Sequence, residues 1–504
     1  MRLEKVIRNS KFLLVQRAAQ MVAQFAVRTA FLWTIGVSYL GLSAVFGDIF
    51  MMLSLMELGI GTAFTYFLYE PIAQEDHQHI RDLLELYRRA YLAVAGIVAV
   101  IGIALFPFLP QLVQSDVALS ELQSVYLLLL ANTVAGYFFS YRQTVFTAYQ
   151  AQYVNAAWYS IFYLLTAAGQ IVVLFLTKNY LAFLAVDVLF QLLRNLLLAR
   201  LVTRAYPAVF EKTPRPLPAD EKRFVFQRVA ALFFHRLGSV AMNGTDSLVM
   251  SFFARLSFVG LYANYMLVYK GVLTIAAQLF AVLTPSVGNL SVTENRQKSR
   301  AVFERLFFAN AWIALYVGLG LALLLNPFLS FWLSEAYVLP LAYPLLIGLM
   351  FFTTMIRQSA VTFNQAGGYF WQTRYKPLLE AALDLGFSLL FAHLLGPIGI
   401  VLGNIASLVL VSVWYDGFIL YRDWFHAPFA DYLRRTALAF LAFFALGGLT
   451  FAMLSAASRW GLGFIGQAVL LTLFVNGTLF VALRKTDAFQ YYWGILQKRI
   501  KKRA

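Results

Sequence analysis

Apolar runs of 20 to 30 residues recur along the whole 504-residue chain, and they constrain its fold more than any other feature. Each run is long enough to cross the hydrocarbon core of a bilayer, about 30 Å thick, as an α-helix. The alternation typical of barrel strands is absent from the sequence. With 61% hydrophobic and only 13% charged residues, a soluble fold of this length is excluded. We therefore predict an all-α polytopic membrane protein.

Fourteen such runs can be counted. They cover residues 9–36, 40–69, 85–110, 121–150, 153–177, 180–206, 223–254, 258–290, 301–326, 338–366, 375–396, 398–422, 435–457 and 460–483. No small-residue cleavage site follows the basic N-terminus closely, so the first run is predicted to be an uncleaved span. With the N-terminus in the cytoplasm, only Lys178, Arg255 and Arg459 fall on the outer side. The positive-inside rule thus predicts that both termini are cytoplasmic.

The second half of the chain repeats the first. Ser38–Leu42 (SYLGL) recurs as Ser257–Leu261 (SFVGL), 219 residues later. Further matched residues are Glu75, Gln78 and Arg81 with Glu294, Gln297 and Arg300, and Arg142 and Gln143 with Arg357 and Gln358. Repeats in membrane transporters place the substrate site near the midplane between the halves, where alternating access operates. Transport is therefore the first hypothesis.

The repeat predicts the domain organisation. Residues 1–206 form a first lobe of six spans, and residues 223–424 form a second lobe. An even number of spans per lobe predicts a pseudo-two-fold axis along the membrane normal. The Pro-rich segment 207–222 is predicted to be an extended cytoplasmic linker. Residues 425–504 hold spans 13 and 14 and a basic tail, for which an interfacial helix or a simple topogenic tail are both open.

Other classes of protein lack support in the sequence. The net charge of +16 lies mostly beside membrane spans, which argues against nucleic-acid binding. No cysteine is present, so disulfides and Cys-ligated metals are excluded, and the five histidines are too scattered for a metal site. No phosphate-binding loop or catalytic motif is found. We expect neither an enzyme nor a bound cofactor.

Four arginines inside the spans form two repeat-related pairs, Arg17 with Arg236 and Arg142 with Arg357. Intramembrane charges usually face a cavity or a partner. Arginine suits a diphosphate because its planar fork binds oxygens bidentately at any relevant pH. We therefore predict that the four arginines bind a diphosphate in a central cavity. Structural roles stay open, because Arg17 could reach the interface and Asp384 could neutralise Arg357.

The remaining intramembrane charges fall into two groups. Arg28 with Asp48, and Asp246 with Lys270, lie at similar depths on adjacent spans and are predicted to form inter-helix ion pairs. Glu57 and Asp384 have no equivalent in the other repeat. An intramembrane carboxylate can take up H⁺ or Na⁺, so both are candidates for ion coupling, with pairing to a cavity arginine as the alternative.

The stretch from Arg28 to Pro71 resembles the start of a known family. It contains the elements Tyr39-Leu40-Gly41, Glu57-Leu58-Gly59-Ile60-Gly61-Thr62-Ala63 and Leu68-Tyr69-Glu70-Pro71. These elements are similar to those of bacterial polysaccharide transporters, the Wzx-type flippases of the multidrug/oligosaccharidyl-lipid/polysaccharide (MOP) superfamily. The resemblance is clearest over spans 1–4. Fourteen spans are typical of the lipid II flippase branch, whereas twelve are common in the superfamily.

The resemblance implies two six-helix bundles around a cavity in the bacterial cytoplasmic membrane. It implies that an undecaprenyl-diphosphate-linked oligosaccharide moves from the cytoplasmic to the outer leaflet, alongside polysaccharide-assembly proteins. Candidate glycan contacts are Gln20, Gln24, Asn243 and Tyr265. Two alternatives remain: a cation-coupled antiporter for drugs or small molecules with the same fold, and a membrane enzyme acting on the same lipid-linked sugar. The sequence does not indicate the sugar or the coupling ion.

Overall fold

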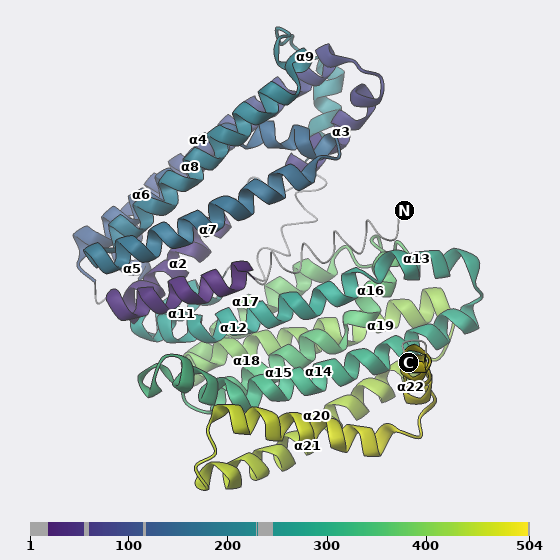
Figure 1. Ribbon diagram of the computed structural model, residues 1–504. Coiled ribbons are helices and arrows are strands. Elements are labelled where there is room, and N and C mark those ends of the chain that lie inside the picture. The colour runs from purple at the N-terminus through teal and green to yellow at the C-terminus, as the bar shows by residue number, and fades with distance from the viewer. Residues whose placement is uncertain (1–18, 55–59, 114–116, 228, 230–244, 502–504) are drawn as a thin grey trace. The chain divides into compact units, whose positions relative to one another are not determined.

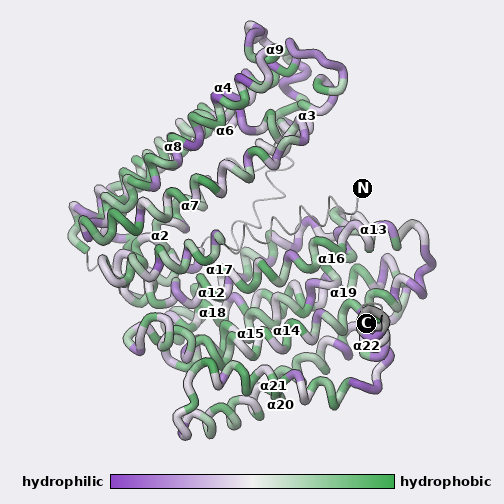
Figure 2. Tube along the Cα trace, in the orientation of Figure 1, coloured by the Kyte–Doolittle hydropathy of each residue, from purple (hydrophilic) through white to green (hydrophobic). Residues whose placement is uncertain are grey.

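The structure, a computed structural model, describes residues 19–54, 60–113, 117–227, 229 and 245–501. These residues are almost entirely helical, and no strand occurs among them. The long helices are apolar along their bodies and polar at their ends (Figures 1 and 2). The prediction of an all-α polytopic membrane protein is confirmed.

Eleven helical segments of the described part are long and apolar enough to cross a membrane. They are His77–Leu112, Leu119–Ala148, Gln152–Thr177, Tyr180–Ala205, Leu256–Leu290, Arg296–Trp332, Ala342–Ala366, Lys376–Leu395, Ile398–Phe425, Phe429–Arg459 and Phe464–Leu483. Each coincides with one predicted span. The other three predicted spans extend outside the described residues. Of the second of them the structure describes α2 (Val37–Leu53) and α3 (Ile60–Ala73), on either side of residues 55–59, which lie outside the described residues.

The chain forms two compact units, Met1–Ala263 and Asn264–Ala504, called here the N-unit and the C-unit. In the N-unit, α8 packs against α6 and α7, and α6 packs against α4 (Figure 1). The bounds of these helices are His77–Leu105 for α4, Leu119–Ala148 for α6, Gln152–Thr177 for α7 and Tyr180–Ala205 for α8. The pairing of α6, α7 and α8 encloses the polar residues considered below.

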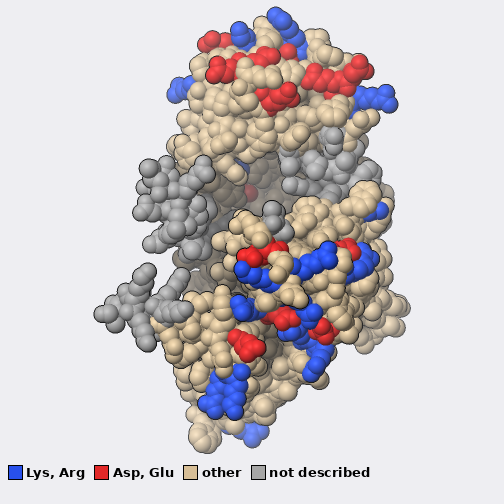
Figure 3. Space-filling model, turned by 90° about the vertical axis from the view of Figure 1, so that its right-hand side faces the viewer, with Lys and Arg blue, Asp and Glu red and all other residues tan. Residues whose placement is uncertain are grey.

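The C-unit is built on two tightly packed helix pairs, α14 with α15 and α17 with α18. Helices α20 and α21 cover α14, and α22 contacts it at one end. The bounds are Arg296–Trp332 for α14, Ala342–Ile356 for α15, Lys376–Leu395 for α17, Ile398–Ser407 for α18, Phe429–Arg459 for α20, Phe464–Leu483 for α21 and Asp487–Lys501 for α22. On the face seen in Figure 3, charged side chains gather in clusters rather than covering the surface evenly.

Side-chain caps begin three of the long helices. Asp76 accepts a hydrogen bond from the backbone N–H of His79 at the start of α4, at 2.9 Å. Asn179 and Asn295 cap α8 and α14 in the same way. Such a cap satisfies an N–H group that has no partner inside the helix, and it stabilises the helix by about 1 kcal/mol. These loop residues therefore help to set where the spans begin.

One repeated motif holds the chain segment that follows the sixth helix of each repeat. In the N-unit, Gln78 and Arg81 donate hydrogen bonds to the backbone carbonyls of Thr213 and Lys212, at 2.9 and 3.3 Å. In the C-unit, the equivalent of Arg81 is Arg300, which pairs with Asp431 at 2.7 Å. The segment predicted to be an extended linker is therefore fastened to the start of α4.

Asp48 has a partner that the sequence did not indicate. Its Oδ2 accepts hydrogen bonds from the backbone N–H groups of Ser247 and Leu248, at 2.7 and 3.1 Å. These groups lie in the first turn of α11 (Asp246–Phe253), where a carboxylate is stabilised by unsatisfied donors and by the helix dipole. The predicted ion pairs Arg28–Asp48 and Asp246–Lys270 stay predictions.

The tail contains a helix, α22, that docks on the C-unit. The Arg305 guanidinium lies 4.0 Å from the centre of the Tyr491 ring, and the Tyr492 hydroxyl donates to the Arg305 carbonyl at 3.2 Å. Burial against α14 raises the pKa of Tyr492. The aromatic part of the tail therefore packs on protein, while contact of the tail with lipid stays a prediction.

Candidate functional site

A polar pocket lies inside the N-unit, among the helix over residues 19–34, α2, α7 and α8. Its volume is about 340 Å³. Three helices each contribute one stripe of residues: Gln24, Arg28 and Phe31; Tyr159, Tyr163, Thr166 and Gln170; and Asp187, Gln191 and Arg194. Within each stripe the spacing is three or four residues, which places the side chains on one helix face. Further walls come from Leu40, Phe162, Phe183 and Phe190.

The charged groups of this pocket are Arg28, Asp187 and Arg194. The Arg194 guanidinium lies over the Tyr159 ring, 4.9 Å from its centre, in a cation–π contact. No described carboxylate lies within ion-pair distance of Arg194, and no described side chain hydrogen-bonds to Asp187. Two arginines and one aspartate therefore face the same cavity, and Asp187 and Arg194 do not form an ion pair.

A second hollow, of about 230 Å³, shares Gln191 and Arg194 with the first. It continues along α6 and α8 to Asn195, whose Oδ1 accepts a hydrogen bond from Gln143 at 3.2 Å. Its other lining residues include Thr133, Tyr137 and Ser140. The interior of the N-unit is thus polar over several turns of α8, which is unusual for helices at membrane depth.

Two of the predicted glycan contacts lie on this side of the N-unit. Gln24 lines the pocket, and the Gln20 amide donates to the Ser160 hydroxyl of α7 at 3.3 Å. Tyr265 lies elsewhere, in the C-unit, where it is fully buried. Its hydroxyl donates to Asn326 and accepts from the backbone N–H of Leu339. In this conformation Tyr265 therefore stabilises the packing of the C-unit.

Arg142, at the far end of α6, is held by hydroxyl groups and aromatic rings. It donates hydrogen bonds to Tyr141 and Thr203, at 2.9 and 3.1 Å, and lies over the Phe210 ring at 5.5 Å. No carboxylate among the described residues pairs with it. Its positive charge is therefore not neutralised by a described acid.

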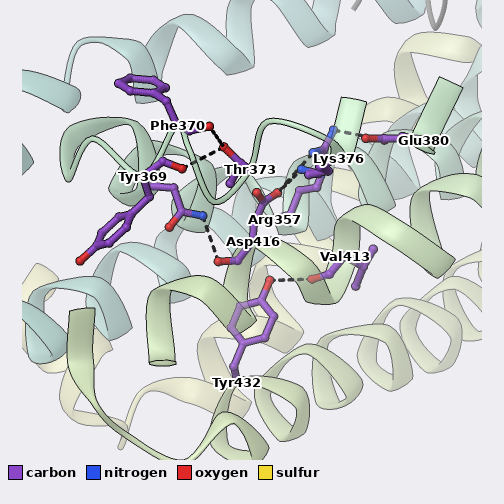
Figure 4. A network of polar contacts seen from close by, with 10 residues as sticks. Arg357, Tyr369, Phe370, Thr373, Lys376, Glu380, Val413, Asp416 and Tyr432 are labelled. Carbon is purple, nitrogen blue, oxygen red and sulfur yellow. Dashed lines mark hydrogen bonds and ion pairs between the residues drawn. The ribbon is translucent and has the colours of Figure 1, made fainter. Parts of the chain in front are cut away.

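The repeat equivalent of Arg142, Arg357, lies instead in a cluster of charges in the C-unit (Figure 4). It follows α15 and pairs with Glu380 at 3.8 Å and with Asp416 at 3.4 Å. Lys376 also pairs with Asp416, at 2.5 Å, and Asn364 donates to the Asp416 carbonyl. Two cations and two carboxylates thus balance each other, with the carboxylates almost fully buried.

The sequence suggested Asp384 as the acid that neutralises Arg357, and this pairing was wrong. Asp384 accepts a hydrogen bond from Ser407 at 3.4 Å, while Glu380, one turn earlier on α17, pairs with Arg357. The Arg357 side chain reaches the first turns of α17, where Glu380 lies, and not the next turn, where Asp384 lies. The role of Asp384 in ion coupling stays a prediction.

Four predicted site residues, Arg17, Arg236, Asn243 and Glu57, lie outside the described residues. In the other direction, sequence reasoning missed the pocket residues Asp187 and Arg194. Both are charges inside the span 180–206 and are seven residues apart, two helical turns on one face. Two intramembrane charges on one helix face are a sufficient sequence signal for a polar site. They were missed because they have no charged equivalents in the second repeat.

Comparison with known proteins shows the fold. No family model matches the chain, and no curated protein is significantly similar in sequence. A lipid II flippase MurJ structure in an inward closed conformation matches with a TM-score of 0.65 and 15% identity, over 94% of this chain and 100% of that chain. An inward-facing multidrug resistance MATE transporter of the MOP superfamily matches at 0.55 and 16% identity, over 80% and 98%.

The MATE multidrug transporter DinF-BH also matches, at a TM-score of 0.55 and 14% identity, over 83% of this chain and 97% of that chain. All three are membrane transporters or flippases. The chain is therefore a multi-pass membrane protein with the fold that these flippases and multidrug transporters share.

Proposed function

We propose that the protein is a flippase that moves an undecaprenyl-diphosphate-linked oligosaccharide from the cytoplasmic to the outer leaflet of the bacterial cytoplasmic membrane by alternating access. On this proposal both termini are cytoplasmic, no covalent chemistry occurs, and polysaccharide-assembly proteins supply and remove the cargo. The four repeat-related arginines, Arg17, Arg142, Arg236 and Arg357, are its proposed diphosphate contacts.

The observation that carries the proposal is the extent of the fold match. The likeness to the lipid II flippase extends over 94% of this chain, against 80% and 83% for the two multidrug transporters. The chemistry of the N-unit pocket agrees with it, because two arginines against one aspartate favour an anionic ligand. Amide and hydroxyl side chains beside them suit a sugar.

A cation-coupled multidrug antiporter is the second candidate, since two of the matched structures are multidrug transporters. For a cationic drug, a pocket with more carboxylates than arginines would be expected. Either function requires an energy source, for which we propose uptake of H⁺ or Na⁺ at Glu57 or Asp384.

The test is transport by the purified protein in proteoliposomes. A fluorescent undecaprenyl-diphosphate oligosaccharide and a cationic dye are assayed in parallel, with H⁺ and Na⁺ gradients applied separately. The proposal expects movement of the lipid-linked sugar between leaflets without dye export. Dye export without lipid movement would establish the antiporter instead, and chemical change of the lipid would establish an enzyme.

A further inference from the structure

The N-unit pocket contains an arginine, Arg194, to which no described residue offers a hydrogen-bond acceptor. Arg194 lies eleven residues before the nearer end of α8, about 16 Å along the helix axis, within a predicted span. A guanidinium has five N–H donors, and the described residues offer Arg194 one aromatic face and no acceptor. A charge kept at this depth indicates a ligand.

The arrangement is particular to the N-unit. Counting 215 residues on from Asp187 and Arg194, the offset that relates Arg142 to Arg357, gives Leu402 and Val409. Both equivalents are apolar. At that offset neither charge is kept in the second repeat, and Arg142, the described repeat-related arginine of the N-unit, does not line the pocket.

The ligand class follows from the lining of the pocket. Arg194 and Arg28 present planar forks that match phosphate oxygens, while Asp187 can only accept, from a hydroxyl or ammonium group. Phenylalanine side chains line the rest. A cavity of about 340 Å³ is at the lower end of the range for small-molecule sites, so it fits a headgroup with at most the adjoining part of a glycan, and not a whole oligosaccharide.

We propose that this pocket is a phosphate-binding site for a lipid headgroup, with Arg194 and Arg28 on the phosphate and Asp187 on a donor group of the same ligand. Two lipids share this chemistry: a polyprenyl diphosphate and a glycerophospholipid. Binding of a polyprenyl diphosphate rests on the proposed function, whereas binding of a glycerophospholipid does not.

The test measures lipid binding to the purified full-length protein by native mass spectrometry. The probes are undecaprenyl diphosphate, phosphatidylglycerol, phosphatidylethanolamine and, as the phosphate-free control, undecaprenol. The variants are Arg194→Ala, Arg194→Lys and Asp187→Asn. Arg200→Ala is the matched control, because Arg200 is exposed on the same helix outside the pocket. Melting temperatures establish that each variant is folded.

We expect at least one phosphate-bearing lipid to bind about tenfold or more tightly than undecaprenol, and the lipid that does so identifies the source. Arg194→Ala should lose about tenfold in that affinity, Arg194→Lys less, and Arg200→Ala nothing. Asp187→Asn, which removes the negative charge, should tighten binding of undecaprenyl diphosphate. If Arg194→Ala does not fold, the other two variants still test the proposal: lipid binding should weaken in Arg194→Lys, and binding of undecaprenyl diphosphate should tighten in Asp187→Asn.

The proposal is overturned if Arg194→Ala and Arg200→Ala bind every probe alike, or if undecaprenol binds as tightly as the phosphate lipids. Its failure is distinguishable from failure of the proposed function. If the wild-type protein flips the lipid-linked sugar but lipid binding is unchanged in all variants, only the phosphate-site proposal is disproved. If phospholipid binds at the pocket but no undecaprenyl-linked cargo is flipped, only the proposed flippase function is disproved.

Discussion

Gly41 and Gly260 touch where α2 crosses the start of α12 (Leu256–Ala281), and each is the equivalent of the other in the repeat. A Cβ added at Gly41 would overlap the carbonyl oxygen of Leu256, and one at Gly260 would overlap the carbonyl oxygen of Val37. Val37 and Leu256 are 219 residues apart, as Gly41 and Gly260 are, so the two contacts are equivalent under the repeat and reciprocal. Such close backbone approach leaves room only for glycine. Helix packing therefore explains the glycine of the repeated segment.

Gly41→Ala is expected to destabilise the protein, because the added methyl group must push two backbones apart. Overpacking of this kind costs about 1–3 kcal/mol. Gly47→Ala on the same helix is the control, since a Cβ there meets no neighbouring atom within 4 Å. Thermal melting of both purified variants is the measurement. Equal melting temperatures would show that the crossing can relax freely.

Asp416→Asn is expected to be strongly destabilising, because it leaves Lys376 and Arg357 with Glu380 as their remaining carboxylate. Breaking a buried pair typically costs about 3–5 kcal/mol. Asp423→Asn on the same span is the control. Its partner Arg422 is more than half exposed, and pairs of that kind contribute about 0–1 kcal/mol. A loss for Asp423→Asn as large as that for Asp416→Asn would contradict a special role for the cluster.

The repeat-related arginines should respond differently to truncation. Arg142→Ala removes a charge that no described acid balances and loses only the hydrogen bonds to Tyr141 and Thr203 and the contact with the Phe210 ring, so its melting temperature should fall less than that of Arg357→Ala. Arg357→Ala leaves two buried carboxylates with only Lys376, so it should melt lower, and adding Glu380→Gln should restore part of the loss. The measurement is the melting temperature of Arg142→Ala, of Arg357→Ala and of the double variant that combines Arg357→Ala with Glu380→Gln. Failure of Glu380→Gln to rescue would show that Glu380 is not the partner that matters.

Flipping by Arg142→Ala provides a functional prediction. If Arg142 contacts the diphosphate of the cargo, the rate should fall by a similar factor for two different glycans, because the diphosphate is common to both. Gln24→Ala, in the N-unit pocket, should instead affect the two glycans unequally. Proteoliposome assays with defined lipid-linked glycans measure both. Wild-type rates for Arg142→Ala with every glycan would exclude this arginine as a contact.

Asp82→Ala should release the linker from α4. The Asp82 carboxylate accepts from the backbone N–H of Arg215 at 2.6 Å and from Gln78 at 2.9 Å. Without it, cleavage by trypsin after Lys212 should accelerate, because local opening becomes easier. Asp220→Ala, at an exposed position of the same linker, is the control. Identical digestion of both variants would show that the carboxylate does not fasten the segment.

Most of the helical architecture followed from the sequence, since each of the eleven described spans coincides with a predicted one. The hydrophobicity of a span and the helix caps in the loops, such as Asn179 and Asn295, act on neighbouring residues, so the local sequence is sufficient to locate these helices.

The sequence by itself determined the membrane class, the approximate positions of the eleven described spans and the repeat, because hydrophobic runs that cross a bilayer must form helices. Only the tertiary structure decided which polar groups meet. Glu380 rather than Asp384 pairs with Arg357, and Asp48 lies on the first turn of α11. The approximate depth of a residue can be counted from sequence, but the neighbours of a helix and their offset along its axis cannot. Glu380 and Asp384 are four residues apart on α17, and that one turn, about 5.4 Å, separates an ion pair from none.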